Sequence, residues 1–170
     1  MKKQILSFKY AFCGVLKAIE SESHMRFHMV AGFYVLLFSF FYKFSPTQWS
    51  LLVILIASIM VLEVVNTCIE EVCNLISEEY HPLIKVIKDM AAGAVLIMSI
   101  AAVVVAVLFF VKVDVIFGII NFFLSNIIYL ILLIISAVFS VIFVMLGPVG
   151  IKNKISSRKA KKRRDTAHNS

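Results

Sequence analysis

The sequence has few charged residues. Asp, Glu, Lys and Arg make up 16% of its 170 residues, whereas hydrophobic residues make up 61%. A mean hydropathy of +0.97 lies outside the range of soluble globular domains. This shortage of charge excludes a soluble globular protein and predicts an integral membrane protein.

Several motifs of catalysis and metal binding are also missing. The chain has neither the GxxxxGK[ST] nor the GxGxxG loop that holds nucleotide phosphates in soluble enzymes, and no HExxH zinc motif. Its three cysteines form no CxxC pair, so disulfide and zinc frameworks have little support. Residues 1–23 are basic and amphipathic without the apolar core of a secretory signal, and we expect them to remain in the mature protein.

Four apolar runs are present, at residues 29–44, 49–62, 90–111 and 127–146. A helix of roughly 20 mostly apolar residues crosses a hydrocarbon core of about 30 Å. The first two runs are short, but each can continue as a helix into neighbouring polar sequence. The sequence therefore predicts four transmembrane helices, with residues 116–128 as an interfacial helix on the outer face.

The distribution of positive charge predicts the orientation of these spans. Basic residues are concentrated in the N-terminal arm, in the loop at residues 74–89 and at residues 152–164. The last of these segments alone holds eight of the seventeen Lys and Arg. By the positive-inside rule, all three segments are cytoplasmic. We expect the tail at residues 151–170 to be disordered and attracted to anionic lipid headgroups, in preference to nucleic acid.

Polar residues interrupt the apolar sequence where the second run ends. Glu63, Asn66 and Glu70 fall within an arc of about 60° on a helix, and Asn74 returns to nearly the same angle. Ionisable groups at membrane depth cost several kcal/mol unless they are solvated or paired. An ordinary helix end entering solvent explains this clustering less well than a site, because carboxylates on one face suit Mg²⁺.

The N-terminal arm supplies a second acidic patch. It holds Glu20 and Glu22, and Glu22 stands four residues before Arg26, as in an i,i+4 ion pair. His24 and His28 are also four apart, the spacing of a zinc pair, but no third ligand is near in the sequence.

A third patch, Lys88 and Asp89, precedes the third apolar run and would meet the other two at the cytoplasmic surface. Lys is a usual phosphate partner, and Asp can hold a cation or orient a hydroxyl. Together the patches predict an acidic, Lys-containing cluster suited to a metal-bound phosphate.

The segment LEVVNTCIEEVCNLISEEYHPLIKVIKDMAAGAVL carries a resemblance to a known family. It is similar to E-x-x-N-[TS]-A-I-E, followed by E-Y-H and K-D-x-A-x-x-A-V, of the prokaryotic diacylglycerol kinase and undecaprenol kinase family. SFKYAFCG, ESHMR and Trp49 stand at the expected distances. The resemblance implies a small lipid kinase of the bacterial cell membrane, with residues 1–111 as its kinase domain, residues 112–150 as an extra membrane segment and residues 151–170 as the tail. It also implies a homotrimer with active sites shared between neighbouring chains and an N-terminal amphipathic helix at the cytoplasmic surface.

The resemblance also implies roles for individual residues. Glu63 matches the catalytic base, and Asn66 matches a residue close to the reacting centre. Arg26 belongs to the arm motif around Glu22. Glu22 and Glu70 match the acids that hold Mg²⁺ on ATP. The implied nucleotide-contacting positions are Lys3, Tyr10, Glu22, Glu70, Glu79, Tyr80, His81, Lys88 and Asp89.

The chain departs from the family pattern at Leu6, where Lys is frequent, at Cys68 and at Asn74. The larger departure is the fourth span with its basic tail, because the family normally stops after three spans. We expect this extra segment neither to supply nor to block site residues.

The sequence leaves alternatives open for the lipid substrate and for the class of function. Thr67 and Pro82 resemble the undecaprenol kinase branch more than the diacylglycerol kinase branch, so undecaprenol is the expected lipid and diacylglycerol the second candidate. Two other classes are a small oligomeric cation transporter that uses Glu63 as an intramembrane ligand, and a membrane scaffold that recruits partners through the basic tail.

Deletion of residues 151–170 discriminates the scaffold from the kinase. A kinase whose site lies within residues 1–111 should keep its activity after this deletion, since the tail supplies no site residue. A scaffold should lose its function. The measurement is ATP-dependent lipid phosphorylation by purified full-length and truncated protein.

Overall fold

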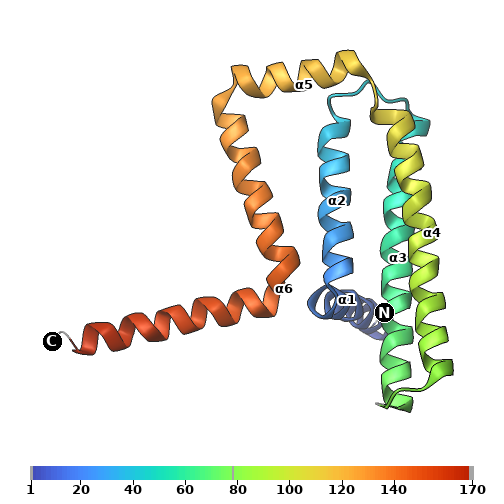
Figure 1. Ribbon diagram of the computed structural model, residues 1–170, viewed down its shortest axis with the longest axis vertical. Coiled ribbons are helices and arrows are strands. Elements are labelled where there is room, and N and C mark those ends of the chain that lie inside the picture. Colours follow the sequence, from blue (N-terminus) through green and yellow to red (C-terminus); the bar gives the residue numbers. More distant parts are fainter. Residues whose placement is uncertain (1, 78, 169–170) are drawn as a thin grey trace.

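The computed structural model describes residues 2–77 and 79–168, which form helices joined by short turns and contain no strand (Figure 1). The helices are α1 (Lys2–Ser21), α2 (Ser23–Ser39), α3 (Pro46–Ile76), α4 (Pro82–Phe110), α5 (Val113–Ser125) and α6 (Ile127–His168). A helix satisfies its backbone hydrogen bonds internally, as the hydrocarbon requires. The predicted all-α membrane fold is confirmed.

Four helices run along one direction, and two cross at opposite ends. α2, α3, α4 and the first part of α6 share the long direction, while α1 crosses toward one end and α5 crosses at the other (Figure 1). α3 packs against both α2 and α4, and α6 packs against α2. The N-terminal arm, the α3–α4 loop and the tail therefore lie toward the same end, as the charge distribution predicts.

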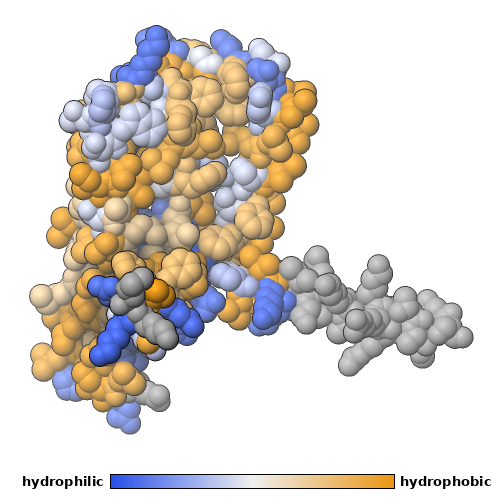
Figure 2. Space-filling model, turned by 180° about the vertical axis from the view of Figure 1, so that it is seen from behind, coloured by the Kyte–Doolittle hydropathy of each residue, from blue (hydrophilic) through white to orange (hydrophobic). Residues whose placement is uncertain are grey.

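Within the described residues, three helical segments are long and apolar enough to cross a membrane: α3, α4 and residues Ile127–Asn153 of α6. α2, which contains most of the predicted first span, has 17 residues and is about 26 Å long. It ends at Ser39, earlier than the apolar run, whose last residues lie in the turn that leads to α3. Figure 2 shows mostly hydrophobic surface on one face of this bundle, with hydrophilic side chains gathered toward its two ends.

Local sequence fixes the starts of the two central helices. At α3, the Ser45 side chain accepts from the Gln48 N–H at 3.3 Å, and the Gln48 side chain accepts from the Ser45 N–H at 2.9 Å. At α4, His81 Nδ1 accepts from the Leu83 N–H at 3.3 Å. A proline follows each capping residue, where its missing N–H costs nothing.

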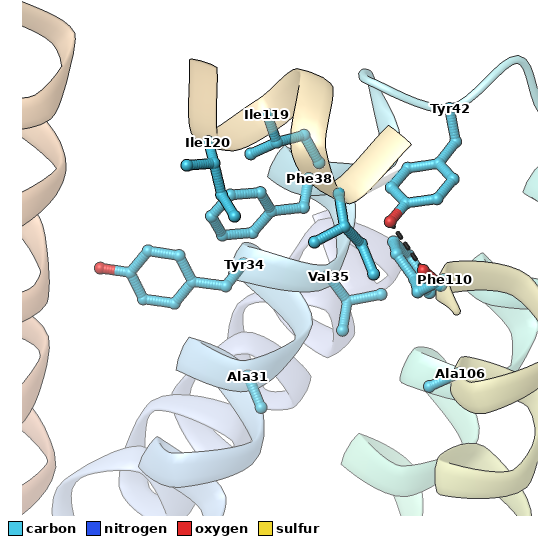
Figure 3. A pocket seen from close by; sticks show the side chains of 10 residues that line it. Ala31, Tyr34, Val35, Phe38, Tyr42, Ala106, Phe110, Ile119 and Ile120 are labelled. Atoms are coloured by element: carbon cyan, nitrogen blue, oxygen red, sulfur yellow. Dashed lines mark hydrogen bonds between the residues drawn. The ribbon is translucent and has the colours of Figure 1, made fainter. Parts of the chain in front are cut away.

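α5 covers one end of a cavity of about 380 Å³ that lies between α2 and α4 (Figure 3). Its Ile119 and Ile120 side chains lie next to Phe38 of α2 there. Beside the cavity, the buried Tyr42 hydroxyl donates to the Phe110 carbonyl at the end of α4 at 2.8 Å. A helix is thus present where an interfacial one was expected, beginning three residues earlier at Val113.

α6 differs from expectation in its second part. Its first part is the predicted fourth apolar segment, and the backbone then leaves helical geometry at Gly147, with φ of 63°. Beyond this bend, the chain is helical as far as His168, although the tail was expected to be disordered. The physical reason is that Ala, Lys and Arg, which are frequent in the tail, are strong helix formers.

α2 and α3 approach closely at Gly32. A Cβ atom at this position would lie 2.9 Å from the Ile56 Cγ2 methyl. Real Cβ atoms do not approach so closely, so the glycine sets the distance between the two helices at this point.

Gly32→Ala should lower the free energy of unfolding by about 1–3 kcal/mol, because the Ile56 methyl branches at its own Cβ and cannot swing away. Unfolding by SDS in mixed micelles measures this change. Gly93→Ala in α4 is the control, because a Cβ there meets nothing within 4 Å. Equal stability of the two variants would contradict the close approach.

Candidate active site

Glu63 is a carboxylate buried inside an apolar helix. It is only 2% exposed, and it lies on α3 some distance before the helix ends at Ile76. His28 of α2 is its partner, with Nε2 3.2 Å from Glu63 Oε1. Because a buried ionisable group needs a partner, this contact between helices explains how Glu63 is accommodated.

The predicted polar stripe on α3 is present. Asn66 Nδ2 donates to Glu70 Oε1 at 3.0 Å, so the two side chains lie on the same face. Asn66 Oδ1 is buried without a hydrogen-bond partner in the described part of the chain. Buried acceptors are rarely left unpaired, so this oxygen is suited to a cation or to a donor group of a ligand.

Glu22 joins this stripe from the corner between α1 and α2. It is half-buried at the residue before α2 begins. The charges of Glu22 and Glu70 both act on the Glu63 carboxyl, as does that of His24. Glu22 is thus close enough to Glu63, which follows it by 41 residues in the sequence, for the two charges to influence one another.

The oxygen atoms of Glu22, Glu70 and Asn66 fit Mg²⁺, which prefers carboxylate and amide oxygens. Among the side chains that the structure describes, at residues 3–77 and 79–153, no three His, Cys, Asp or Glu form a complete metal site. A Mg²⁺ ion on these acids would therefore take its remaining ligands from phosphate oxygens and water. The zinc pair considered for His24 and His28 finds no third ligand in that part of the chain, and His28 lies against Glu63 instead.

Lys88 is tied to the end of the same stripe. Its Nζ donates to Asn74 Oδ1 at 2.7 Å, across the α3–α4 contact. Asp89 instead lies 3.8 Å from Lys85, and both side chains are exposed. An exposed i,i+4 pair of this kind contributes little stability, so Asp89 remains accessible to a ligand.

The other implied nucleotide-contacting residues are exposed and lie on α1 or in the α3–α4 connection. They are Lys3, Tyr10, Glu79, Tyr80 and His81. His81 also caps α4 through Nδ1. In the described residues, no hydrogen bond or ion pair joins any of them to Glu63, Asn66 or Glu70.

Arg26 does not form the ion pair with Glu22 that its i,i+4 spacing predicted. Its guanidinium, in a residue that is 5% exposed, donates to three backbone carbonyls. Two of them, Ile19 and Glu20, end α1, and the third, Val144, belongs to α6. The extra segment therefore contacts a residue of the arm motif through a backbone carbonyl, although it was not expected to supply site residues.

A cavity of about 300 Å³ lies between α2, α3 and α4. Apolar side chains such as Phe27, Leu52 and Ile59 line it, together with the polar residues His28 and Ser99. Since His28 contacts Glu63, a hydroxyl group on an apolar chain could approach this pair from the membrane.

Sequence reasoning missed the contact of His28 with Glu63. The spacing of His28 from His24 indicated only a metal pair. Which residue of α2 faces Glu63 depends on how α2 packs against α3, and no spacing within either helix encodes that.

Comparison with known proteins gives a family match and two relatives. The model of the family described as prokaryotic diacylglycerol kinase matches residues 9–110. An undecaprenol kinase of Bacillus subtilis is 34% identical over 104 residues, which are 61% of this chain and 85% of that protein. A diacylglycerol kinase of Synechocystis sp. is 36% identical over 102 residues, 59% of this chain and 58% of that protein.

His28→Leu should lower the free energy of unfolding by about 1–3 kcal/mol, because it leaves the buried Glu63 without its partner. In a Glu63→Met background the same substitution should cost less, with a coupling energy of about 0.5–3 kcal/mol. SDS unfolding of the four proteins measures this cycle. Glu71→Leu, at an exposed position of α3, is the control, and strictly additive costs for His28 and Glu63 would refute the pairing.

Proposed function

This chain belongs to the prokaryotic diacylglycerol kinase family, and from that membership we propose that it transfers the γ-phosphate of ATP to undecaprenol at the cytoplasmic face of the bacterial cell membrane. It is a multi-pass membrane protein and a lipid kinase. Because the matching family and both relatives are described as lipid kinases, the hypotheses of a cation transporter and of a scaffold are set aside.

One observation carries the proposal most directly: a buried carboxylate, Glu63, is paired with His28 beside an apolar cavity. A lipid alcohol cannot leave the bilayer, so its base must be delivered to the depth of the hydroxyl. A helix that crosses the membrane and carries Glu63 part-way along its length does this.

In the proposed reaction, the Glu63 carboxylate accepts the proton of the lipid hydroxyl. The alcohol oxygen forms a bond to the γ-phosphorus of ATP, and the bond from that phosphorus to the β,γ-bridging oxygen breaks, which releases ADP. His28, 3.2 Å from the carboxylate, holds it in position. Asn66 lies one turn further along α3, near the reacting atoms.

Phosphoryl transfer depends mainly on positioning and on neutralising charge. Glu22 and Glu70 would hold Mg²⁺, which when bound would offset the negative charge of the phosphates. Lys88 adds a positive charge from α4. The exposed residues Lys3, Tyr10, Glu79, Tyr80, His81 and Asp89 would contact the nucleotide from the aqueous side.

ATP is a cytoplasmic substrate, so the end of the bundle with α1 and the α3–α4 loop would face the cytoplasm. The positive-inside rule supports the same orientation, with both termini cytoplasmic. The basic tail would then lie along anionic headgroups. We include in the proposal a homotrimer in which neighbouring chains share active sites, since within the described part of one chain no hydrogen bond or ion pair joins the exposed nucleotide-side residues to Glu63.

Undecaprenol is favoured over diacylglycerol by Thr67 and Pro82, which resemble the undecaprenol kinase branch. The undecaprenol kinase relative is also matched over 85% of its length, against 58% for the diacylglycerol kinase. Diacylglycerol is the second candidate.

The test offers undecaprenol and diacylglycerol separately, with ATP and Mg²⁺, to purified protein in bicelles. We expect faster phosphorylation of undecaprenol, and a loss of about 100-fold or more in Glu63→Gln, because this side chain cannot accept the proton. Glu71→Gln, exposed on the same helix, should leave the rate unchanged. If neither alcohol is phosphorylated, the proposal fails, and a faster reaction with diacylglycerol would select the second candidate.

A further inference from the structure

The bend of α6 leaves one backbone acceptor without its helical partner. In a continuous helix, the N–H of residue 148 would donate to the carbonyl of Val144. Residue 148 is proline and has no N–H, and the backbone at Gly147 is outside helical geometry. An unpaired carbonyl near the membrane is costly, so Val144 needs a donor from elsewhere.

Arg26 of α2 supplies that donor. Its Nε donates to the Val144 carbonyl at 3.1 Å, while its Nη1 donates to the carbonyls of Ile19 and Glu20 at 2.9 and 3.0 Å. No carboxylate lies within 4 Å of this buried cation in the described residues. Its charge is instead stabilised by the negative ends of two helix dipoles, that of α1 and that of the first part of α6.

Gly147 makes room for this arrangement. A Cβ at Gly147 would lie 3.0 Å from the guanidinium carbon of Arg26 and 3.1 Å from Nη1. The φ of 63° is also in the left-handed region, which glycine adopts at little cost. Residue type and backbone geometry at position 147 therefore both suit contact with Arg26.

A second contact holds α6 along α2. The Tyr34 hydroxyl lies 2.9 Å from the Ser136 hydroxyl and 3.3 Å from that of Ser140. Ser136, Ser140 and Val144 are four residues apart and share one face of α6. Hydrogen bonds between helices in a membrane stabilise their association, so α6 is attached to α2 at two levels.

We propose that Arg26, Gly147 and Pro148 form a clamp through which the fourth span holds the α1–α2 corner, and with it Glu22, in place beside Glu63. Arg26 and α6 would thus be positioning elements of the kinase site. This inference rests on the role proposed above for Glu22 in holding Mg²⁺. In the sequence, Glu22 lies between Arg26 and the residues whose carbonyls Arg26 binds at the end of α1. Loss of the contact between Arg26 and α6 would therefore loosen the turn that carries the Glu22 carboxylate.

The test uses the full-length chain with two substitutions of the bend. Gly147→Leu places a side chain against the guanidinium, and Gly147→Ala combined with Pro148→Ala lets α6 continue straight and restores the N–H of residue 148. Gly118→Leu in α5 is the matched control, because a Cβ there meets nothing within 4 Å.

Two quantities are measured for each protein: the Mg²⁺ concentration that gives half-maximal undecaprenol phosphorylation, and the rate of amide hydrogen exchange at the α1–α2 corner without substrates. Both bend variants should raise the first by about fivefold or more while changing the KM for undecaprenol by less than about twofold. Both should also speed exchange at the corner but not at the start of α3. Gly118→Leu should behave as the wild type.

Wild-type Mg²⁺ dependence and exchange in the bend variants would overturn the clamp. If Gly147→Leu does not fold, the double alanine variant decides by the same two measurements. An equal rise in the KM for undecaprenol would also count against the clamp, because a general loosening of the protein predicts it. Failure of the wild type to phosphorylate either alcohol would instead refute the proposed function, and the exchange measurement would still report on the clamp.

Discussion

The pairing of a buried carboxylate with a residue from another helix is the constraint on which the rest of this structure depends. Glu63 is placed where water is scarce, and His28 has to reach it from α2. His28 lies one turn from Gly32, where α2 comes close to Ile56 of α3. Without a glycine at that point, α2 would be held further from α3, and the histidine would be withdrawn from the acid.

From this pair, the site extends in two directions that differ in polarity. Toward the membrane lies an apolar cavity lined in part by His28. Toward the end of α3 lies a row of polar side chains, Asn66, Glu70 and Asn74, which leads to Lys88 on α4. A reaction between a lipid alcohol and a water-soluble nucleotide needs both surroundings within a short distance, and a single 31-residue helix provides them.

The sequence predicted those features that depend on one helix at a time. The common face of Asn66 and Glu70 follows from the helical period, and their hydrogen bond confirms it. Contacts between helices could not be predicted from spacing within one helix. Arg26 was expected to pair with Glu22, which is near in sequence, but it binds carbonyls of α1 and α6. The predicted end of the first span lies beyond the end of α2 because apolar residues continue through the turn after Ser39. The tail was expected to be disordered because it has few apolar residues and charge mostly of one sign, although its residues favour helix.

The crossing helix α5 has a consequence for how the chain is inserted in the bilayer. By carrying the chain from the end of α4 to the start of α6, it lets α6 run back along the bundle, so α6 bends toward the end of the bundle at which α1 lies (Figure 1). A chain continued beyond α4 without returning would have to translocate the eight Lys and Arg of residues 152–164 through hydrocarbon. In the proposed orientation, with both ends cytoplasmic, α5 and α6 would spare the cationic end that translocation.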